Sequence, residues 1–191
     1  FTMKTFTLVV AVGLLTLGCS KKNYTNPKFF DCNKTTNFKP DTDKKKLIYA
    51  ILKRGLVINK DVQDYQLIND KTKIYLQNSF YEDLQIGSGK KSLLTNSDVP
   101  YTINQVRFCL KSKYELQQIA DKTGDFLYLT LGNIEILDNS AKIGLSNRWV
   151  MSSKNKIKTI HLSGGGYILT FKKVNGTWTY DTTATHRSWT S

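Results

Sequence analysis

One segment of this sequence that could form a binding site is the glycine-rich run Ser163-Gly164-Gly165-Gly166. A glycine run can bind phosphate when a helix follows it, because the helix N-terminus presents free backbone N–H groups to the anion. Here a strand pattern follows the glycines, and no Gly-Lys-Ser/Thr sequence comes after them. The glycines therefore indicate either a sharp bend or bulge with positive φ before a strand, or a bare floor on which a ligand approaches the backbone.

Two further candidates for catalysis are His161 and Glu135. His161 lies just before the glycines and could act as a general base, but the sequence has no Gly-x-Ser-x-Gly motif to supply a nucleophile. Glu135 would need an apolar pocket and a second carboxylate to act as a catalytic acid. Its alternation with Ile134 and Ile136 predicts a solvent-facing side chain instead. A hydrolase with a pocket near His161 and glycines 164–166 is therefore the alternative interpretation, and no catalytic residue is assigned.

Aromatic side chains near the predicted C-terminal strands form the remaining candidate site. Trp149, Tyr167 and Trp178 come from segments with strand patterns, where aromatic residues pack in a core or line a concave mouth of a sheet. Together with His161 they define a candidate pocket for a small apolar or sugar ligand. Both interpretations, core and pocket, remain open from the sequence.

The cysteines are few and lack metal-binding spacing. The sequence has three, at positions 19, 32 and 109, with no Cys-x-x-Cys pair and no Cys/His cluster, so we expect no metal site and no cofactor. Cys32 and Cys109 could form a disulfide in an oxidising compartment. The alternative is a buried free thiol at Cys109 and an unpaired Cys32.

The first nineteen residues have the pattern of a targeting signal. Lys4 precedes an apolar run of thirteen residues, Phe6 to Gly18, and a polar stretch follows Cys19. The run is too short to cross a bilayer comfortably, which takes about 20 residues, and fits the apolar region of a signal peptide. An ordinary secretory leader is the alternative to the lipid attachment signal described next.

The segment Leu15-Thr16-Leu17-Gly18-Cys19 resembles the lipobox of bacterial lipoproteins. Thr16 occupies the position where that family usually has leucine. The resemblance implies that residues 1–18 are cleaved, that Cys19 carries palmitate-type acyl chains, and that the protein is a membrane-anchored lipoprotein of the bacterial cell envelope. Its place would be the periplasmic side or the outer-membrane surface.

The charge of the chain narrows the expected partners. The formal net charge is +13, but only four of the 28 basic residues are arginines, and the lysines are spread along the whole chain. Nucleic-acid recognition relies on clustered arginines, so we expect no nucleic acid partner. The expected partners are the membrane, reached through the lipid, and an envelope protein or a small-molecule ligand.

The order of the predicted elements indicates one α+β domain at 44–191, preceded by a tether at 19–43. Helical patterns cover 44–56 and 112–124, the first ending at Gly55 and the second starting at a Ser-x-x-Glu capping box. Strand patterns cover 73–80, 102–110, 125–131, 133–137, 142–146 with 149–150, and 167–174, and Asn175-Gly176 predicts a tight hairpin. We expect a twisted antiparallel sheet with both helices packed on one face.

Two resemblances concern the domain itself. The segment Tyr167–Tyr180 is similar to the closing hairpin of the cone-shaped fold of nuclear transport factor 2, and the span from Ser112 to Trp178 resembles uncharacterised secreted bacterial lipoproteins. The first implies a cone-shaped sheet, and the second implies no activity. We therefore expect a non-catalytic ligand- or protein-binding module. The alternatives are the hydrolase described above and a purely structural surface lipoprotein.

Overall fold

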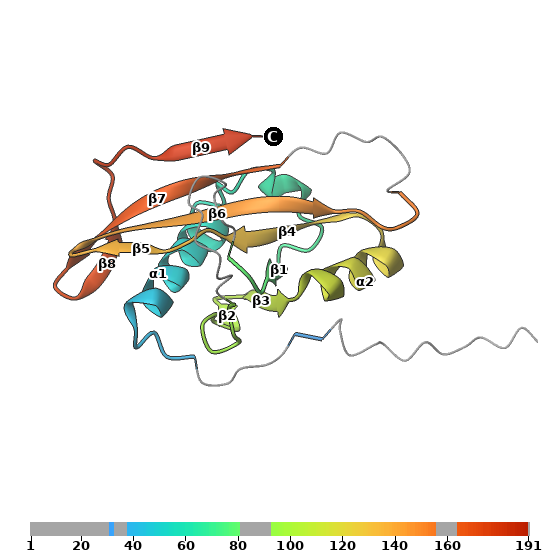
Figure 1. The fold of residues 1–191 in the computed structure, drawn as a ribbon, viewed down its shortest axis with the longest axis horizontal. Coiled ribbons are helices and arrows are strands. Elements are labelled where there is room, and N and C mark those ends of the chain that lie inside the picture. Colours follow the sequence, from blue (N-terminus) through green and yellow to red (C-terminus); the bar gives the residue numbers. More distant parts are fainter. Residues whose placement is uncertain (1–30, 33–37, 81–92, 156–163, 191) are drawn as a thin grey trace, which may run out of the picture.

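The computed structural model describes residues 31–32, 38–80, 93–155 and 164–190, and these form an α+β fold (Figure 1). The expected fold class is confirmed. The helical elements are α1 (Asp43–Leu52), η2 (Lys53–Ile58), η3 (Tyr65–Leu67) and α2 (Lys113–Thr123). The strands are β1 (Lys73–Gln77), β2 (Thr102–Ile103), β3 (Val106–Lys111), β4 (Phe126–Leu131), β5 (Glu135–Leu137), β6 (Ser140–Val150), β7 (Gly165–Val174), β8 (Thr177–Tyr180) and β9 (Arg187–Thr190).

The nine strands form one mixed, open sheet in the order β2-β3-β1-β4-β6-β7-β8. Strand β5 pairs with β6, and β9 pairs with the part of β7 that β8 leaves uncovered. The sheet is not purely antiparallel, because β1 runs parallel to both β3 and β4. Long connections, one of which contains α2, allow the chain to return in the same direction before it pairs again.

Helix α1 begins where the sequence predicts it, and the helical chain continues past the predicted end at Gly55. The Thr42 side chain accepts a hydrogen bond from the backbone N–H of Lys45, which caps the helix. Gly55 does not end the helix as expected, because the chain continues through the π-helical turn η2. A Cβ at Gly55 would collide with the Tyr167 hydroxyl, so glycine is needed here for close packing.

Helix α2 has the predicted caps. The side chain of Ser112 accepts from the backbone of Glu115, and Glu115 in turn accepts from the backbone of Ser112. Gly124 follows the helix with a φ of +94°, a conformation that favours glycine. The hairpin between β7 and β8 likewise turns at Asn175 and Gly176, both with positive φ.

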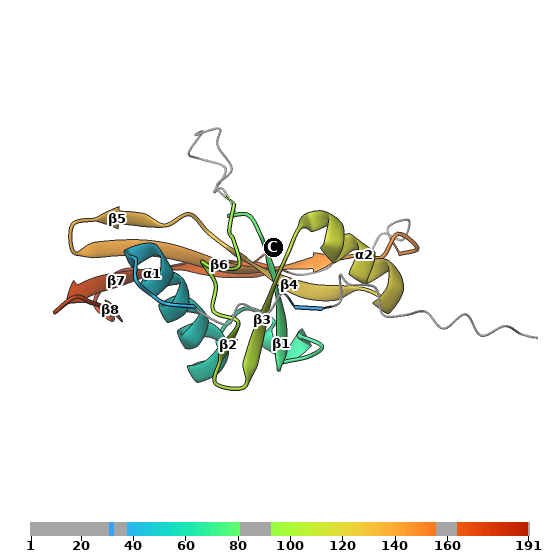
Figure 2. The same cartoon turned by 90° about the horizontal axis from the view of Figure 1, so that it is seen from below.

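The two helices lie against opposite faces of the sheet, and the expectation that both pack on one face is wrong (Figure 2). Along β4, Leu127 and Leu129 belong to the large core that contains α1, whereas Phe126 and Tyr128 belong to a smaller core under α2. Successive side chains of a strand point to opposite faces, so a fully buried strand serves both helices. We call these the α1 face and the α2 face.

Gly165 and Gly166 belong to strand β7, and neither has the positive φ that the sequence suggested. They are required for another reason. A Cβ at Gly166 would lie 2.5 Å from the Cβ of Ser146 on β6, and one at Gly165 would collide with the backbone of Trp189 on β9. The neighbouring backbones therefore exclude any side chain here.

None of the helices in the described parts of the chain combines enough length and apolar character to cross a bilayer.

Candidate functional site

One candidate site is a cavity of about 780 Å³ between helix α1, the turn η2 and the β7–β8 hairpin. We call it the basic groove. Among the described residues, its lining contains no carboxylate but three cations and four aromatic side chains: Lys46, Lys53, Arg54, Tyr49, Phe171, Trp178 and Tyr180. Ala50 and Ile58 add apolar surface.

Arg54 is held in the basic groove from two sides. Its Nη1 donates to Oδ2 of Asp61 at 2.9 Å, and its guanidinium carbon lies 4.1 Å from the centroid of the Tyr180 ring. Its Nε is buried without a hydrogen-bond partner among the described residues. An ion pair and a stacked ring fix the plane of the guanidinium, which is the arrangement arginine uses to bind anions.

Asp61 connects Arg54 to the core. The Tyr167 hydroxyl donates to the other oxygen of Asp61, Oδ1, at 3.3 Å. Burial raises the pKa of the Tyr167 phenol, and the negative charge of Asp61 raises this pKa further. Tyr167 therefore stays protonated near neutral pH and acts as a donor that positions Asp61, and through it Arg54.

Asp43 fastens the other wall of the basic groove. The indole Nε1 of Trp178 donates to Oδ1 of Asp43 at 3.0 Å, and the Lys173 ammonium donates to Oδ2 at 2.8 Å. These two interactions, that with Lys173 first, lower the pKa of Asp43. Because Asp43 starts α1 and Trp178 lies on β8, this cluster ties the helix to the hairpin. Trp178 is only 6% exposed, so it serves both the core and the groove wall.

The lysines of the basic groove lie close to polar and aromatic partners. The Lys53 ammonium is 5.8 Å from the Tyr49 ring centroid, and that of Lys46 donates to the carbonyl of Gly176 at 3.5 Å. Both ammonium groups are strongly hydrated point charges on flexible stems. They are placed to meet an anion above an apolar wall.

The structure brings together some of the predicted pocket residues. Trp178 lines the basic groove, and Tyr167 lies behind it on the same face of the sheet. Trp149 lies near the other end of the sheet beside a separate hollow, and its Nε1 is buried without a hydrogen-bond partner among the described residues. His161 lies outside the described residues. The candidate pocket of four residues is therefore divided.

Sequence reasoning missed the groove residues of α1. Tyr49 and Ala50 each lie three or four residues from both Lys46 and Lys53, the first residue of η2, so the four form a row along one side of the helical segment. That row lies next to the buried stripe and was visible in the sequence. The predicted hairpin supplies β8, but the sequence did not indicate that β8 lies beside this row of α1.

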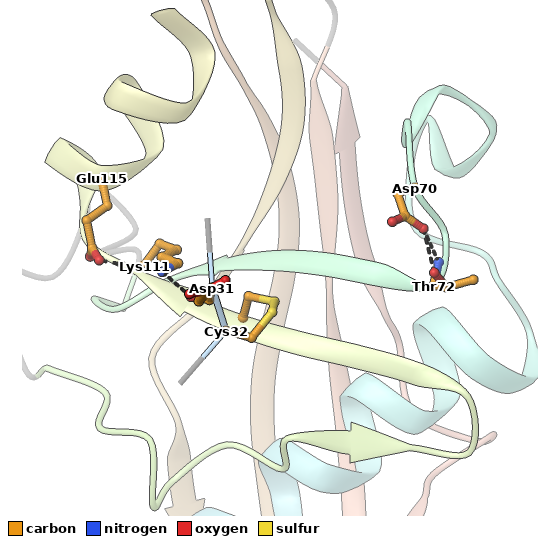
Figure 3. The surroundings of a disulfide bond; sticks show 7 residues. Asp31, Cys32, Asp70, Thr72, Lys111 and Glu115 are labelled. Carbon is orange, nitrogen blue, oxygen red and sulfur yellow. Dashed lines mark hydrogen bonds and ion pairs between the residues drawn. A yellow bond between two sulfur atoms is a disulfide. The ribbon is translucent and has the colours of Figure 1, made fainter. Parts of the chain in front are cut away.

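A disulfide joins Cys32 to Cys109 of β3, with the two Cα atoms 4.7 Å apart (Figure 3). Beside it lies Lys111, which is 2% exposed and donates to the carbonyl of Asp31 at 2.7 Å. Glu115 of α2 lies 3.6 Å from the same ammonium group. Burial lowers the pKa of Lys111, and the charge of Glu115 opposes this effect. The cluster fastens residues 31–32 to the sheet.

The remaining predictions concern metals and the leader. In the described part of the chain, no group of three or more His, Cys, Asp or Glu residues could hold a metal ion. Cys19 and the predicted signal peptide 1–18 lie outside the described residues.

The geometry of the basic groove favours binding an anion with an apolar body. No protein-family model matches the chain, and neither curated proteins nor solved structures give a significant match.

Proposed function

We propose that this protein is a lipid-anchored lipoprotein of the bacterial cell envelope and that it binds, without catalysis, a small ligand with an apolar body and an acidic group. The observation that carries the proposal is the lining of the basic groove. It contains three cations and a wall of aromatic side chains, and no carboxylate is among the described lining residues. An acidic group gains charge-assisted hydrogen bonds there, and an apolar body gains contact area.

The volume of the basic groove and the fixed position of Arg54 support ligand binding. Its volume of about 780 Å³ lies within the range of about 300–1,000 Å³ that is typical of small-molecule sites. Arg54 is already fixed by Asp61 and Tyr180, so little side-chain entropy is lost when an anion binds.

The proposed location rests on the leader and is supported by the cysteines. The lipobox-like segment Leu15–Cys19 implies acylation, and two or more acyl chains give stable anchoring because each buried CH₂ contributes about 0.8 kcal/mol. A disulfide between Cys32 and Cys109 fits an oxidising compartment outside the cytosol. The hydrolase alternative gains no support, since His161 lies outside the described residues and Gly165 and Gly166 are part of β7.

Calorimetric titration with phenyl phosphate tests the ligand class. We expect saturable binding to the wild type and a loss of about tenfold in affinity in Lys53→Gln, because one charge-assisted contact is removed. Lys154→Gln, which changes an exposed lysine outside the groove, should bind as the wild type does. Equal affinity of all three proteins, or equal binding of the uncharged benzyl alcohol, would contradict the proposed ligand class.

Metabolic labelling with a palmitate analogue tests the anchor. The wild type should be labelled and recovered with membranes, whereas Cys19→Ala should be neither. Cys32→Ala is the matched control, because it removes a cysteine without touching the lipobox, and it should be labelled as strongly as the wild type. Labelling of Cys19→Ala would show that the acylation site is elsewhere or that the label is adventitious.

A further inference from the structure

A second cavity, of about 260 Å³, lies on the α2 face of the sheet, which is opposite to the face on which α1 packs. We call it the sheet pocket. Strands β5, β6, β7 and β9 contribute to its lining, together with Gly132 and Asn133 at the end of β4. Helix α2 covers a different part of this face, where it packs on Phe126 and Tyr128.

The strand register defines the layout of the sheet pocket. Directly paired residues share a face, with their Cβ atoms about 4.5–5.5 Å apart. One row across the sheet is Trp189, Gly166, Ser146 and Thr130; the next is Arg187, Ile168, Gly144 and Gly132; the third is Thr170, Lys142 and Glu135. Trp189 and Arg187 therefore lie at the β9 end of the first two rows and Glu135 at the β5 end of the third, with the small residues Gly166, Ser146 and Gly144 between them.

The floor of the sheet pocket is largely bare backbone. A Cβ at Gly132 would lie 3.0 Å from the Cα of Gly144, and Gly166 has no room for a Cβ at all. The hydroxyls of Ser146 and Thr130 lie 2.7 Å apart and bond to each other. A ligand can therefore rest flat against the peptide planes of β6 and β7.

The walls combine an aromatic ring with groups of both charge signs. Trp189 and Arg187 stand on one side, and Glu135 and Lys142, which pair across β5 and β6, stand on the other. Glu135 disfavours an anion and the two cations disfavour a positively charged ligand. A neutral polyol can bond to both the carboxylate and the cations of these walls, because each of its hydroxyls both donates and accepts hydrogen bonds.

We infer that the sheet pocket binds one neutral sugar ring, stacked between Trp189 and the glycine floor. A pyranose ring offers an apolar C–H face to the indole and hydroxyls at its edge to Glu135, Lys142 and Arg187. The volume of about 260 Å³ lies just below the range of drug-sized ligands, about 300–1,000 Å³, and so suits a single ring. This site is separate from the basic groove and does not depend on its function.

The three tryptophans of the chain allow the inference to be tested by their side-chain indole N–H signals in NMR. The full-length protein in a detergent without a sugar headgroup is titrated with glucose, galactose and N-acetylglucosamine up to about 50 mM, which covers millimolar affinities. We expect at least one of these sugars to shift the Trp189 signal saturably and to leave the Trp178 signal, which reports on the basic groove, in place.

Two variants sharpen the test. Trp189→Ala should weaken binding, followed by calorimetry, about tenfold or more, and Glu135→Gln, which keeps the size of an exposed side chain, should weaken it several-fold. Tyr114→Ala removes an exposed aromatic ring of α2 outside the pocket and should bind as the wild type does. The inference is overturned if no sugar moves the Trp189 signal, if glycerol moves it equally, or if Trp189→Ala binds with unchanged affinity.

Discussion

The two faces of the sheet are covered in different ways. On the α1 face, one continuous apolar core runs from β3 to β8 beneath α1 and η2. On the α2 face, helix α2 covers the β4 end, the disulfide-bonded segment 31–32 lies over β3, and the part over β5, β6, β7 and β9 is hollowed by the sheet pocket. The comparison indicates that one face supplies most of the hydrophobic stability and the other leaves surface for recognition.

Side-chain volume follows the same division. In β4 and β6, the α1 face receives leucine and isoleucine, whereas the open part of the α2 face receives glycine, serine and threonine: Leu129, Leu131, Ile143 and Leu145 against Thr130, Gly132, Gly144 and Ser146. A hollow on the α2 face is therefore compatible with a stable fold. The predictions below separate the contributions of the two faces.

The largest effect should follow loss of the covalent link on the α2 face. Cys109→Ala removes a disulfide between residues 77 positions apart, and for a loop of this length we expect a loss of about 4 kcal/mol. Urea unfolding measures it. Cys32→Ala should show a similar loss, since either change removes the same bond, and two variants that unfold at the wild-type midpoint would mean that the link contributes nothing.

Two neighbouring aliphatic residues of β7 allow the contributions of the two faces to stability to be compared directly. Leu169 points into the core on the α1 face and is 5% exposed, whereas Ile168 is partly exposed on the floor of the sheet pocket. Leu169→Ala should cost about 3 kcal/mol, and Ile168→Ala clearly less, because its cavity is already open to solvent. Chemical denaturation of both variants gives the difference. Equal losses would contradict the assignment of stability to the α1 face.

Much of the local structure is predictable from the sequence. The capping box at Ser112, the hairpin turn at Asn175 and the buried stripe of α1 depend on neighbouring residues, and all three form as expected. The parallel pairing of β1 was not predictable, because it depends on which distant strands lie beside it.

The sites were less predictable than the elements. The aromatic residues of the C-terminal part, Trp189 included, are candidates for a core or a ligand site from the sequence alone, but strand β9 is short and has no clear turn signal before it, so its pairing with β7 and the sheet pocket were not expected. The glycines at 165 and 166 were compatible with a bend or with a bare floor for a ligand, because the sequence does not reveal which backbone lies beside them. Arg54 and Asp61 lie seven residues apart, but their link to Tyr167 spans more than a hundred positions and exists only in the folded protein.

A pair of glycine variants tests the floor of the sheet pocket. A Cβ at Gly166 would lie 2.6 Å from the carbonyl oxygen of Leu145, whereas one at Gly144 would lie 3.3 Å from its nearest neighbour, the Cα of Gly132. Gly166→Ala should therefore cost about 2 kcal/mol through overpacking, and Gly144→Ala less than about 1 kcal/mol. Thermal unfolding of the two variants checks the order, and a reversed order would refute the close approach of β6 and β7.

The smallest effect concerns the stability of the fold at low pH. Hydrogen bonds from Thr183 and Lys172 lower the pKa of Asp181 to about 2. The folded state therefore binds protons less readily than the unfolded state, whose pKa is near 3.8. The stabilisation is complete above that value and is lost as the pH falls towards 2. Asp181→Asn should lose less melting temperature than the wild type as the pH falls from about 3.8 to about 2. The control Glu135→Gln, which changes an exposed carboxylate, should follow the wild type. Identical profiles for the wild type and both variants would exclude Asp181 as the cause.

The proposals above give each face of the sheet its own binding site. This assignment is tested most directly by one pair of NMR titrations on the full-length protein, with phenyl phosphate and with the sugar that binds best. We expect phenyl phosphate to shift the indole signal of Trp178 alone and the sugar to shift the indole signal of Trp189 alone. Shifts of both signals by one probe, or of neither signal by both probes, would contradict the assignment.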